Sequence, residues 1–461
     1  MTSRIIRTGR AAATGFMLAV LAAGTAGADS LRTAMADAYS NSQLLEQNRY
    51  LLRLRDEDVA QAVAQLLPTL DFTANATRNL IADTTTSTAQ LVADMTIYAG
   101  GSRIAARQAA EATLEATRQQ LVTVESQVLL DAVTAYLDVW EAQQVVSVRQ
   151  SNVRVLTQQL RAARDRFEVG EDTRTDVAQA EATLAQARSA LAAAEGSLEI
   201  ARELFNLSIG RYPNGLSGPQ GRPALPGSEE EAARLARQEH PAIRALQSEV
   251  RAAEFAVEQA RAAGRPTLSA RLSSSETFQS PDPTREGNAA SLSLTLSQPI
   301  YRGGQIGSRE RQALAQAEAA RANLNRQVQL NLQGVGNAYA RLRIATAQIQ
   351  ASDQRIRAAE LAFEGVREEA SLGARTTLDV LDAEQDLLEA RISRIEAASD
   401  LYAASYSVLS ASGLLTVAHL DLPVPRYDVD AYGAAFPAGT PRVASPQGDR
   451  LDDLLRAIGR E

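Results

Sequence analysis

The sequence predicts a mainly helical protein with a small β part, built from two copies of one structural unit. The main observation is an internal repeat: Tyr98-Ala99-Gly100-Gly101 returns as Tyr301-Arg302-Gly303-Gly304, an offset of 203 residues. A period this long indicates two halves of one architecture rather than a short-repeat solenoid. Aromatic residues make up only 4% of the chain, which argues against a thick globular core, and alanine-rich stretches favour helix.

Composition also limits the chemistry. The chain has no cysteine, which excludes disulfides, zinc–thiolate sites and a cysteine nucleophile. Its two histidines, His240 and His419, leave little scope for histidine-based catalysis or metal binding. No nucleophile–base–acid set is recognisable, and the glycine pairs lack the lysine and the spacing of a phosphate-binding loop. We therefore predict that the protein is not an enzyme and that it binds no cofactor or metal.

The N-terminal stretch 1–28 has the pattern of an export signal that is removed. It carries three arginines and no acidic residue, then an apolar run at 11–23 and a small-residue end, Ala26-Gly27-Ala28. The whole chain has a formal net charge of −8, and loss of this stretch makes it more acidic, which disfavours nucleic-acid binding. No other segment is long enough for a transmembrane helix, so insertion into a membrane would have to use strands.

Each copy of the unit shows the same order of elements. A helix stops at Pro-Thr-Leu, which occurs at 68–70 and 266–268, and two strand-like stretches follow. The strand pattern is clearest where Leu292, Leu294 and Leu296 alternate with polar residues. Gly-Gly precedes a very long helix, and a further glycine separates it from a shorter one.

The predicted boundaries follow from these signals. The first copy covers 29–210, with a helix at about 31–66, strands at about 70–98, a long helix at 102–169 and a helix at 173–209. The second covers 228–413, with a helix at about 229–263, strands at about 267–300, a long helix at 306–372 and a helix at 376–412. A Pro/Gly-rich linker, 211–227, joins the copies, and we expect the tail, 414–461, to be largely disordered.

The two long helices carry a seven-residue apolar repeat, which imposes supercoiling. The rows are Ala132, Val139, Val146, Val153, Leu160 and Phe167 in the first copy, and Val328, Val335, Leu342, Ile349, Ile356 and Phe363 in the second. Heptads alone fit an ordinary antiparallel coiled coil. Each long helix would extend about 100 Å, however, which is nearly the length of two shorter helices placed end to end. We therefore expect each long helix to pack against two short ones.

The strands raise the question of a membrane. Each chain supplies four candidate strands of about 9–13 residues, long enough for a tilted crossing of a bilayer. Four strands leave two open edges, and hydrocarbon does not tolerate open edges. Two interpretations remain open on the strands alone. Several chains pool their strands into one closed membrane barrel, or the strands form a soluble four-stranded cap.

Four motifs stand in order along the two copies. They are Leu67-Pro68-Thr69-Leu70, Arg166-Phe167-Glu168-Val169-Gly170 followed by Thr175-Asp176, Gln298-Pro299-Ile300-Tyr301-Arg302-Gly303-Gly304, and Gly373-Ala374-Arg375-Thr376-Thr377-Leu378-Asp379-Val380-Leu381-Asp382. Through these motifs, the sequence from about residue 31 to 413 resembles the TolC-like family of outer-membrane efflux and secretion channels. The resemblance implies a homotrimer in the outer membrane, with twelve pooled strands forming a barrel that continues as a long α-helical coiled-coil tunnel into the periplasm.

The same resemblance implies a function and partners. The chain would form the exit duct of a tripartite efflux or type I secretion system and conduct substrates passively across the periplasm and the outer membrane. Its partners would be a periplasmic adaptor (membrane fusion) protein, an inner-membrane transporter of ABC or RND type, and outer-membrane lipid. The rival interpretation is a soluble periplasmic coiled-coil scaffold or adaptor, which would not need detergent for extraction.

The turns at Gly170 and Gly373 end the long helices, so in such a channel they lie at the periplasmic mouth. Asp379 and Asp382 are three residues apart on one helix face, and three chains would form two stacked carboxylate rings that favour cations. In the family, acidic residues at these positions line the narrowest constriction. The alternative for Asp176 and Asp379 is helix capping, because each closes a Thr-x-x-Asp pattern. Asp382 is therefore the better ring residue.

The resemblance also implies a latch. Arg375 would bridge to Thr175 or Asp176 on the neighbouring hairpin and help to hold the mouth closed. Ala370 stands where well-known members have a tyrosine that latches the closed state. Because alanine makes no such hydrogen bond, we expect a looser mouth, or one latched by Arg375 alone.

Adaptor docking is expected at the hairpin tips, which comprise Val169, Gly170, Glu171 and Gly373. In the family an apolar residue often follows the first tip glycine, whereas Glu171 stands there in this chain. The docking contact is therefore expected to be more polar and to suit a different class of adaptor.

Overall fold

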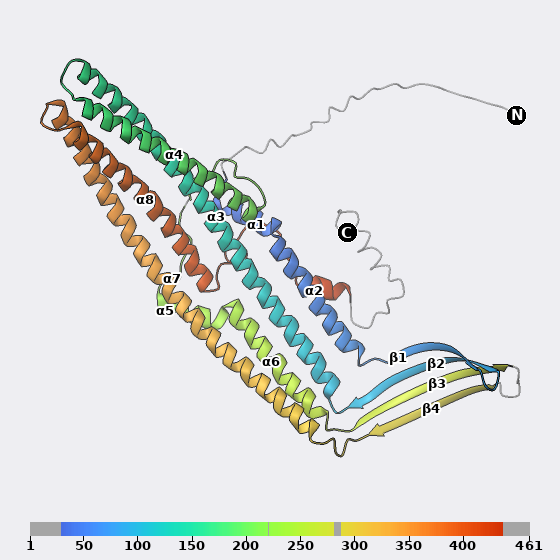
Figure 1. Ribbon diagram of the computed structural model, residues 1–461. Coiled ribbons are helices and arrows are strands. Elements are labelled where there is room, and N and C mark those ends of the chain that lie inside the picture. Colours follow the sequence, from blue (N-terminus) through green and yellow to red (C-terminus); the bar gives the residue numbers. More distant parts are fainter. Residues whose placement is uncertain (1–28, 220, 281–286, 437–461) are drawn as a thin grey trace, which may run out of the picture.

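The computed structural model describes residues 29–219, 221–280 and 287–436. The expected export signal, 1–28, and the last part of the tail, 437–461, lie outside the described residues. The chain forms an elongated body of roughly parallel helices, with one four-stranded sheet at one end and two helical tips at the other (Figure 1). The prediction of a mainly helical, duplicated fold with a small β part is confirmed.

The elements follow the same order in both repeats. The first repeat contains α1 (Leu31–Asn41), α2 (Gln43–Ala64), β1 (Thr69–Asn79), β2 (Thr84–Ala99), α3 (Ser102–Glu168) and α4 (Arg174–Ile209). The second contains α5 (Glu229–Glu239), α6 (Pro241–Ala262), β3 (Thr267–Ser280), β4 (Gly287–Ser297), α7 (Gln305–Ser371) and α8 (Thr377–Ala411). A short helix, α9 (Ala431–Ala435), follows the second repeat. We call α3 with α4 the first hairpin, and α7 with α8 the second hairpin.

The long helices α3 and α7 have 67 residues each and extend for about 100 Å. Helix α3 packs against α4 toward the tip and against α2 and α6 toward the sheet; α7 packs against α8 toward the tip and α6 toward the sheet (Figure 1). Each long helix thus packs against short helices toward both of its ends, as expected, but α3 also contacts α6 and α8 of the second repeat, which was not expected. Among the described helices, none combines the length and the apolar character needed to cross a membrane.

The helix expected before the strands is broken in each repeat. The breaks lie at Ser42 and His240, which are 198 residues apart and therefore occupy equivalent positions. Both residues adopt extended backbone angles and cap the following helix. At His240 the cause is Pro241, since a residue before proline is driven out of the α region. At Ser42 the hydroxyl instead accepts the N–H of Leu45 at 3.2 Å, which starts a new helix.

The cap at His240 makes stability depend on pH. Its Nδ1 accepts the backbone N–H of Ala242 at 3.2 Å, and burial lowers the pKa of His240 although the imidazole also interacts with the Ser410 backbone as a hydrogen-bond donor, which raises the pKa. The unfolded chain therefore binds the proton more tightly. The stability that the cap contributes is present above about pH 6.5 and is lost as the pH falls through the lowered pKa.

We expect wild type to lose thermal stability on acidification. His240→Asn caps the helix without titrating, so it should reduce this loss by about 1 kcal/mol. The measurement is thermal unfolding of the purified protein between pH 7.5 and 5. His419→Asn, at an exposed position, is the matched control and should follow the wild-type profile. Equal profiles for wild type and His240→Asn would contradict the capping role.

The four strands form one antiparallel sheet in the order β1-β2-β3-β4, with β1 and β4 at open edges. Leu292, Leu294 and Leu296 on β4 are 66–72% exposed and lie directly opposite residues of β3 that include two further leucines. The opposite face is polar and carries the ion pair between Arg271 and Asp94, 2.7 Å apart. The sheet extends away from the helices, so none of the described helices covers the apolar face (Figure 1).

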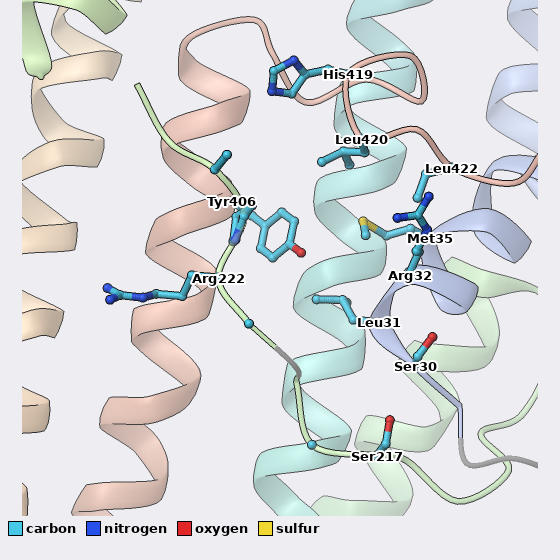
Figure 2. A pocket seen from close by; sticks show the side chains of 14 residues that line it. Ser30, Leu31, Arg32, Met35, Ser217, Arg222, Tyr406, His419, Leu420 and Leu422 are labelled. Carbon is cyan, nitrogen blue, oxygen red and sulfur yellow. The ribbon is translucent and has the colours of Figure 1, made fainter. Parts of the chain in front are cut away.

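The largest apolar core lies where α1, the middle of α3 and the end of α4 meet. Residues after the second repeat complete it: Leu415, Val417 and Leu422 are 0%, 2% and 6% exposed. In this stretch the structure differs from the expected disorder. Proline and glycine prevent regular secondary structure here, but the apolar side chains between them are still buried. A pocket of about 470 Å³ lies beside the segment, with Met35, Tyr406 and His419 among its lining residues (Figure 2).

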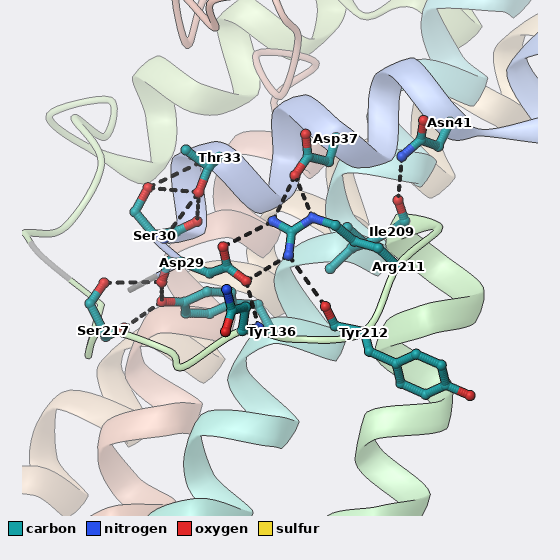
Figure 3. A network of polar contacts seen from close by, with 11 residues as sticks. Asp29, Ser30, Thr33, Asp37, Asn41, Tyr136, Ile209, Arg211, Tyr212 and Ser217 are labelled. Carbon is teal, nitrogen blue, oxygen red and sulfur yellow. Dashed lines mark hydrogen bonds and ion pairs between the residues drawn. The ribbon is translucent and has the colours of Figure 1, made fainter. Parts of the chain in front are cut away.

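An arginine at the start of the linker ties the first residues of the described chain to this core (Figure 3). The Arg211 guanidinium binds Asp29 at 2.6 Å and Asp37 at 2.7 Å. Burial alone would raise the pKa of Asp29, but Arg211 and the N–H of Asn214 lower it overall. The fully buried Tyr136 donates its hydroxyl to the Asp29 carbonyl at 2.8 Å. The linker is thus fixed to both α1 and α3.

Candidate functional site: the two hairpin tips

The two tips are built in the same way. Gly170 and Gly373 have φ angles of +84° and +76°, in the left-handed region that glycine adopts without strain. After each glycine, the next residue donates its N–H back to the long helix: Glu171 to the carbonyl of Arg166 at 2.9 Å, and Ala374 to that of Glu369 at 2.9 Å. Both long helices therefore end in the C-terminal glycine motif that satisfies their last carbonyls.

The shorter helices begin with reciprocal caps. The N–H of Thr173 donates to the Asp176 carboxylate at 2.9 Å, and the N–H of Thr376 donates to that of Asp379 at 2.9 Å. Hydrogen bonds from the threonine side chain and backbone lower the pKa of Asp176, and those from Thr376 lower the pKa of Asp379. The capping interpretation thus describes both aspartates within one chain. A cap also leaves each carboxylate ionised, so capping is compatible with a charged ring.

Asp382 lies one turn further along α8 and is exposed. Within the part of the chain that the structure describes, its carboxylate has no hydrogen bond and no ion pair, in contrast to Asp379. The same described residues contain no group of three or more His, Cys, Asp or Glu side chains placed to hold a metal. Asp382 is therefore a free surface charge in one chain, available to neighbours or to ions.

Each tip is spanned by one ion pair, and the two pairs have opposite polarity. In the first hairpin, Arg166 contacts Asp172 at 3.0 Å. In the second, Glu369 contacts Arg375 at 2.8 Å. The offset of 203 residues maps Arg166 onto Glu369 and Asp172 onto Arg375. The same bridge thus occurs twice, with the cation before the turn in one copy and after it in the other.

This arrangement bears on the expected latch. Within the described chain Arg375 binds Glu369 of its own hairpin, and Thr175 is exposed, so a bridge from Arg375 to Thr175 or Asp176 remains a proposal for contacts between chains. At the tips, a hydrogen bond that joins the two hairpins is made by Arg166, whose Nη2 donates to Thr377 Oγ1 at 3.2 Å. The sequence reasoning missed Arg166. Applying the repeat offset to the charged residues around Arg375 is the signal that would have found it.

A polar cavity of about 890 Å³ separates the two tips. Its lining residues come from both hairpins: Gln159, Arg166, Glu171, Asp172, Asp176, Arg367, Ala370, Ser371, Leu372, Gly373, Arg375, Thr376, Thr377 and Val380. Ala370 therefore lies where a larger side chain would fill space between the hairpins. The outermost apolar residues are Val169 and Leu372, 72% and 84% exposed. Leu372 is the repeat equivalent of Val169 and was also missed.

Comparison with known proteins agrees with this architecture. A family model described as outer membrane efflux protein matches residues 34–211 and 232–414. Outer membrane efflux protein BepC of Brucella suis biovar 1 is 35% identical over 413 residues, covering 88% of this chain and 90% of that protein. Alkaline protease secretion protein AprF of Pseudomonas aeruginosa is 27% identical over 309 residues, 65% of this chain and 64% of that protein. The CmeC outer membrane channel of Campylobacter jejuni has a TM-score of 0.76 at 16% identity, with 88% of each chain covered.

Two long hairpins that extend from one sheet in a duplicated chain have the fold of TolC-type channels. With the model matched over most of both repeats, the chain belongs to the outer membrane efflux protein family. It is an outer-membrane efflux or secretion channel that reaches into the periplasm, and it transports without catalysing a reaction. The channel interpretation is thus confirmed over that of a soluble scaffold. Channels of this family form trimers that work in tripartite systems.

Proposed function

We propose that three copies of this chain form the exit duct of a tripartite efflux or type I secretion system. The observation that carries the proposal is the uncovered sheet, whose one face is apolar and whose other face is polar. Its two open edges, β1 and β4, leave backbone donors and acceptors that a bilayer does not tolerate. Pairing of β1 with β4 of the next copy satisfies both edges and closes a twelve-stranded barrel, with the apolar face toward lipid.

The hairpins then continue from the barrel toward the inner membrane. Their length of about 100 Å is suited to crossing much of the periplasm. A periplasmic adaptor would dock on the tips at Val169, Gly170, Glu171 and Gly373, together with Leu372, and an inner-membrane transporter of ABC or RND type would supply energy. The similarity to both an efflux protein and a protease secretion protein supports the general role of an exit duct.

Within this trimer we assign Asp382, with Asp379 beside it, to a carboxylate ring at the periplasmic aperture. Three copies around one axis bring the exposed Asp382 side chains together, and a ring of carboxylates favours cations. Arg375, Asp176 and Thr175 form the latch between neighbouring chains in this arrangement. Arg375 would then exchange Glu369 for a partner on the adjacent chain when the mouth closes.

The test is single-channel conductance of the purified protein in a planar bilayer. The expected result is that the protein requires detergent for extraction, migrates as a trimer after cross-linking, and gives small cation-selective current steps. A protein that stays in the soluble fraction, or a detergent-extracted trimer that never conducts even with its tips removed, would overturn the proposal.

A further inference from the structure

We propose that the pocket beside α1 (Figure 2) binds a small amphipathic organic anion, meaning a sulfonate, sulfate or carboxylate attached to an apolar ring or chain. Its volume of about 470 Å³ lies in the usual range of small-molecule sites. The lining residues come from α1, the linker between the repeats, α8 and the stretch after the second repeat. The inference concerns binding alone and does not depend on conduction through the channel.

The floor of the pocket is apolar and firmly packed. Leu31, Met35 and Leu422 line it, and they are 8%, 3% and 6% exposed. All three belong to the largest core, and Leu420 packs against the same core while lining the pocket. Because a close-packed core yields little, this floor keeps its shape and offers an apolar surface to the apolar part of a ligand.

One polar side chain points into the pocket without a partner. Tyr406 on α8 is 7% exposed, and Figure 2 shows its hydroxyl directed toward Leu31 and Met35 of α1. Within the described part of the chain this hydroxyl makes no hydrogen bond, whereas the buried Tyr136 and Tyr339 donate theirs to backbone carbonyls. Buried polar groups are normally hydrogen-bonded, so the unpaired phenol indicates a position for a polar atom of a ligand.

The charges around the pocket favour an anion. None of the described residues that line it is acidic, although the whole chain has a formal net charge of −8. Arg222 lines the pocket but extends away from α1 (Figure 2), so Arg32 of α1 is the cation placed to contact a ligand. Its Nη2 donates to the carbonyl oxygen of Asp421, whose carboxylate is 4.0 Å away and 92% exposed. A guanidinium has five N–H donors, so Arg32 retains donors for an anionic group.

The chain carries its own reporter for this pocket. Trp140 is the only tryptophan, and its Nε1 lies 3.4 Å from the position of a Cβ on Gly218, which lines the pocket. The probe is anilinonaphthalenesulfonate, an amphipathic anion that accepts excitation energy from tryptophan. Its matched neutral probe is N-phenylnaphthylamine, the same molecule without the sulfonate. Energy transfer from Trp140 therefore reports probe bound close to the pocket.

The experiment titrates each probe into the purified full-length protein in a nonionic detergent and subtracts the signal of protein-free micelles. We expect the sulfonate to bind saturably at one site per chain, and the neutral probe to bind at least tenfold more weakly. Arg32→Gln should weaken binding of the sulfonate about tenfold, and Tyr406→Phe about fivefold, because each removes one hydrogen bond to the ligand. Tyr406→Phe removes a hydroxyl that has no partner in the described chain, so thermal stability should stay unchanged.

The matched controls are Arg188→Gln and Tyr212→Phe, which remove an exposed arginine and an exposed tyrosine outside the pocket. Both should bind the sulfonate like wild type. Equal affinity for the two probes, or equal weakening in Arg188→Gln and Arg32→Gln, would overturn the preference for an anion. Unchanged binding in both Arg32→Gln and Tyr406→Phe would overturn the site.

The remaining outcomes also decide. If wild type shows no saturable energy transfer, the pocket holds only solvent and the proposal is wrong. If Arg32→Gln does not fold, Tyr406→Phe and the comparison of the two probes decide alone. Because no readout involves conductance, failure of this site leaves the proposed channel function intact, and failure of the channel leaves the site intact.

Discussion

Replacing Gly100 with alanine is expected to destabilise the protein by about 4 kcal/mol, whereas Gly303→Ala costs about 1 kcal/mol. The two glycines are equivalent in the repeat and have φ angles of +61° and +57°. A Cβ at Gly100 would lie 2.6 Å from the Cβ of Arg265 and 2.9 Å from the carbonyl oxygen of Ala262. A Cβ at Gly303 meets nothing within 4 Å. The pair thus separates steric overlap from backbone strain.

Thermal unfolding of the detergent-solubilised protein measures this difference. Gly101→Ala is a second control: its φ angle is +89°, and a Cβ there would contact only the end of the flexible Arg265 side chain, at 3.5 Å. It should behave like Gly303→Ala. Equal destabilisation at Gly100 and Gly303 would show that α6 can move away from the start of α3 without loss of stability. That result would contradict the close packing of Gly100 against Ala262 and Arg265.

Asp382→Asn is expected to raise the concentration of a trivalent lanthanide ion needed to block the channel at least tenfold, or about 1.4 kcal/mol of binding free energy. The reason is that one substitution removes three charges from the proposed ring. Asparagine keeps the size of the side chain, so the geometry of the aperture should persist. Asp379→Asn also removes one ring of charge but should have a smaller effect. Its amide oxygen still accepts the N–H of Thr376, so the helix cap at this position is kept.

The matched control is Asp165→Asn, at an exposed carboxylate near the tip of the first hairpin. It removes the same charge from α3 and should leave the blocking concentration unchanged. Block that weakens equally in Asp165→Asn and Asp382→Asn would indicate a general surface-charge effect. Block that persists in Asp382→Asn would remove Asp382 from the aperture and leave it as ordinary surface charge. Planar-bilayer recordings over a series of lanthanide concentrations provide the measurement.

Features with a local cause could be predicted from the sequence. The heptads on α3 and α7 predicted long supercoiled helices, and the glycines at 170 and 373 predicted where they end. The caps at Asp176 and Asp379 followed from the Thr-x-x-Asp pattern, because a cap depends on residues three positions apart. The helix break at His240 could also be predicted from the sequence, because Pro241 forces it. The break at Ser42 could not, because serine is compatible with a continuous helix.

Features that depend on how distant helices are aligned could not be predicted. The contact of Arg166 with Thr377 joins residues 211 positions apart, and it depends on the relative rotation of α3 and α8. Likewise, burial of Leu415 and Val417 depends on a groove that exists only after α1 and α3 have packed together. In such cases the local sequence pattern shows that a residue is suited to burial or to a polar contact. Only the tertiary arrangement determines which residue is its partner.

The largest core has a consequence for the order in which this protein folds. It combines Leu31 and Tyr39, near the beginning of the described chain, with Leu415, Val417 and Leu422 near its end. The backbone N–H of Tyr427 even donates to the hydroxyl of Tyr39, at 3.4 Å. Synthesis delivers α1 first and its last packing partners almost 400 residues later. Until then the core around α1 is incomplete, so the nascent protein has a long period of vulnerability to aggregation and proteolysis.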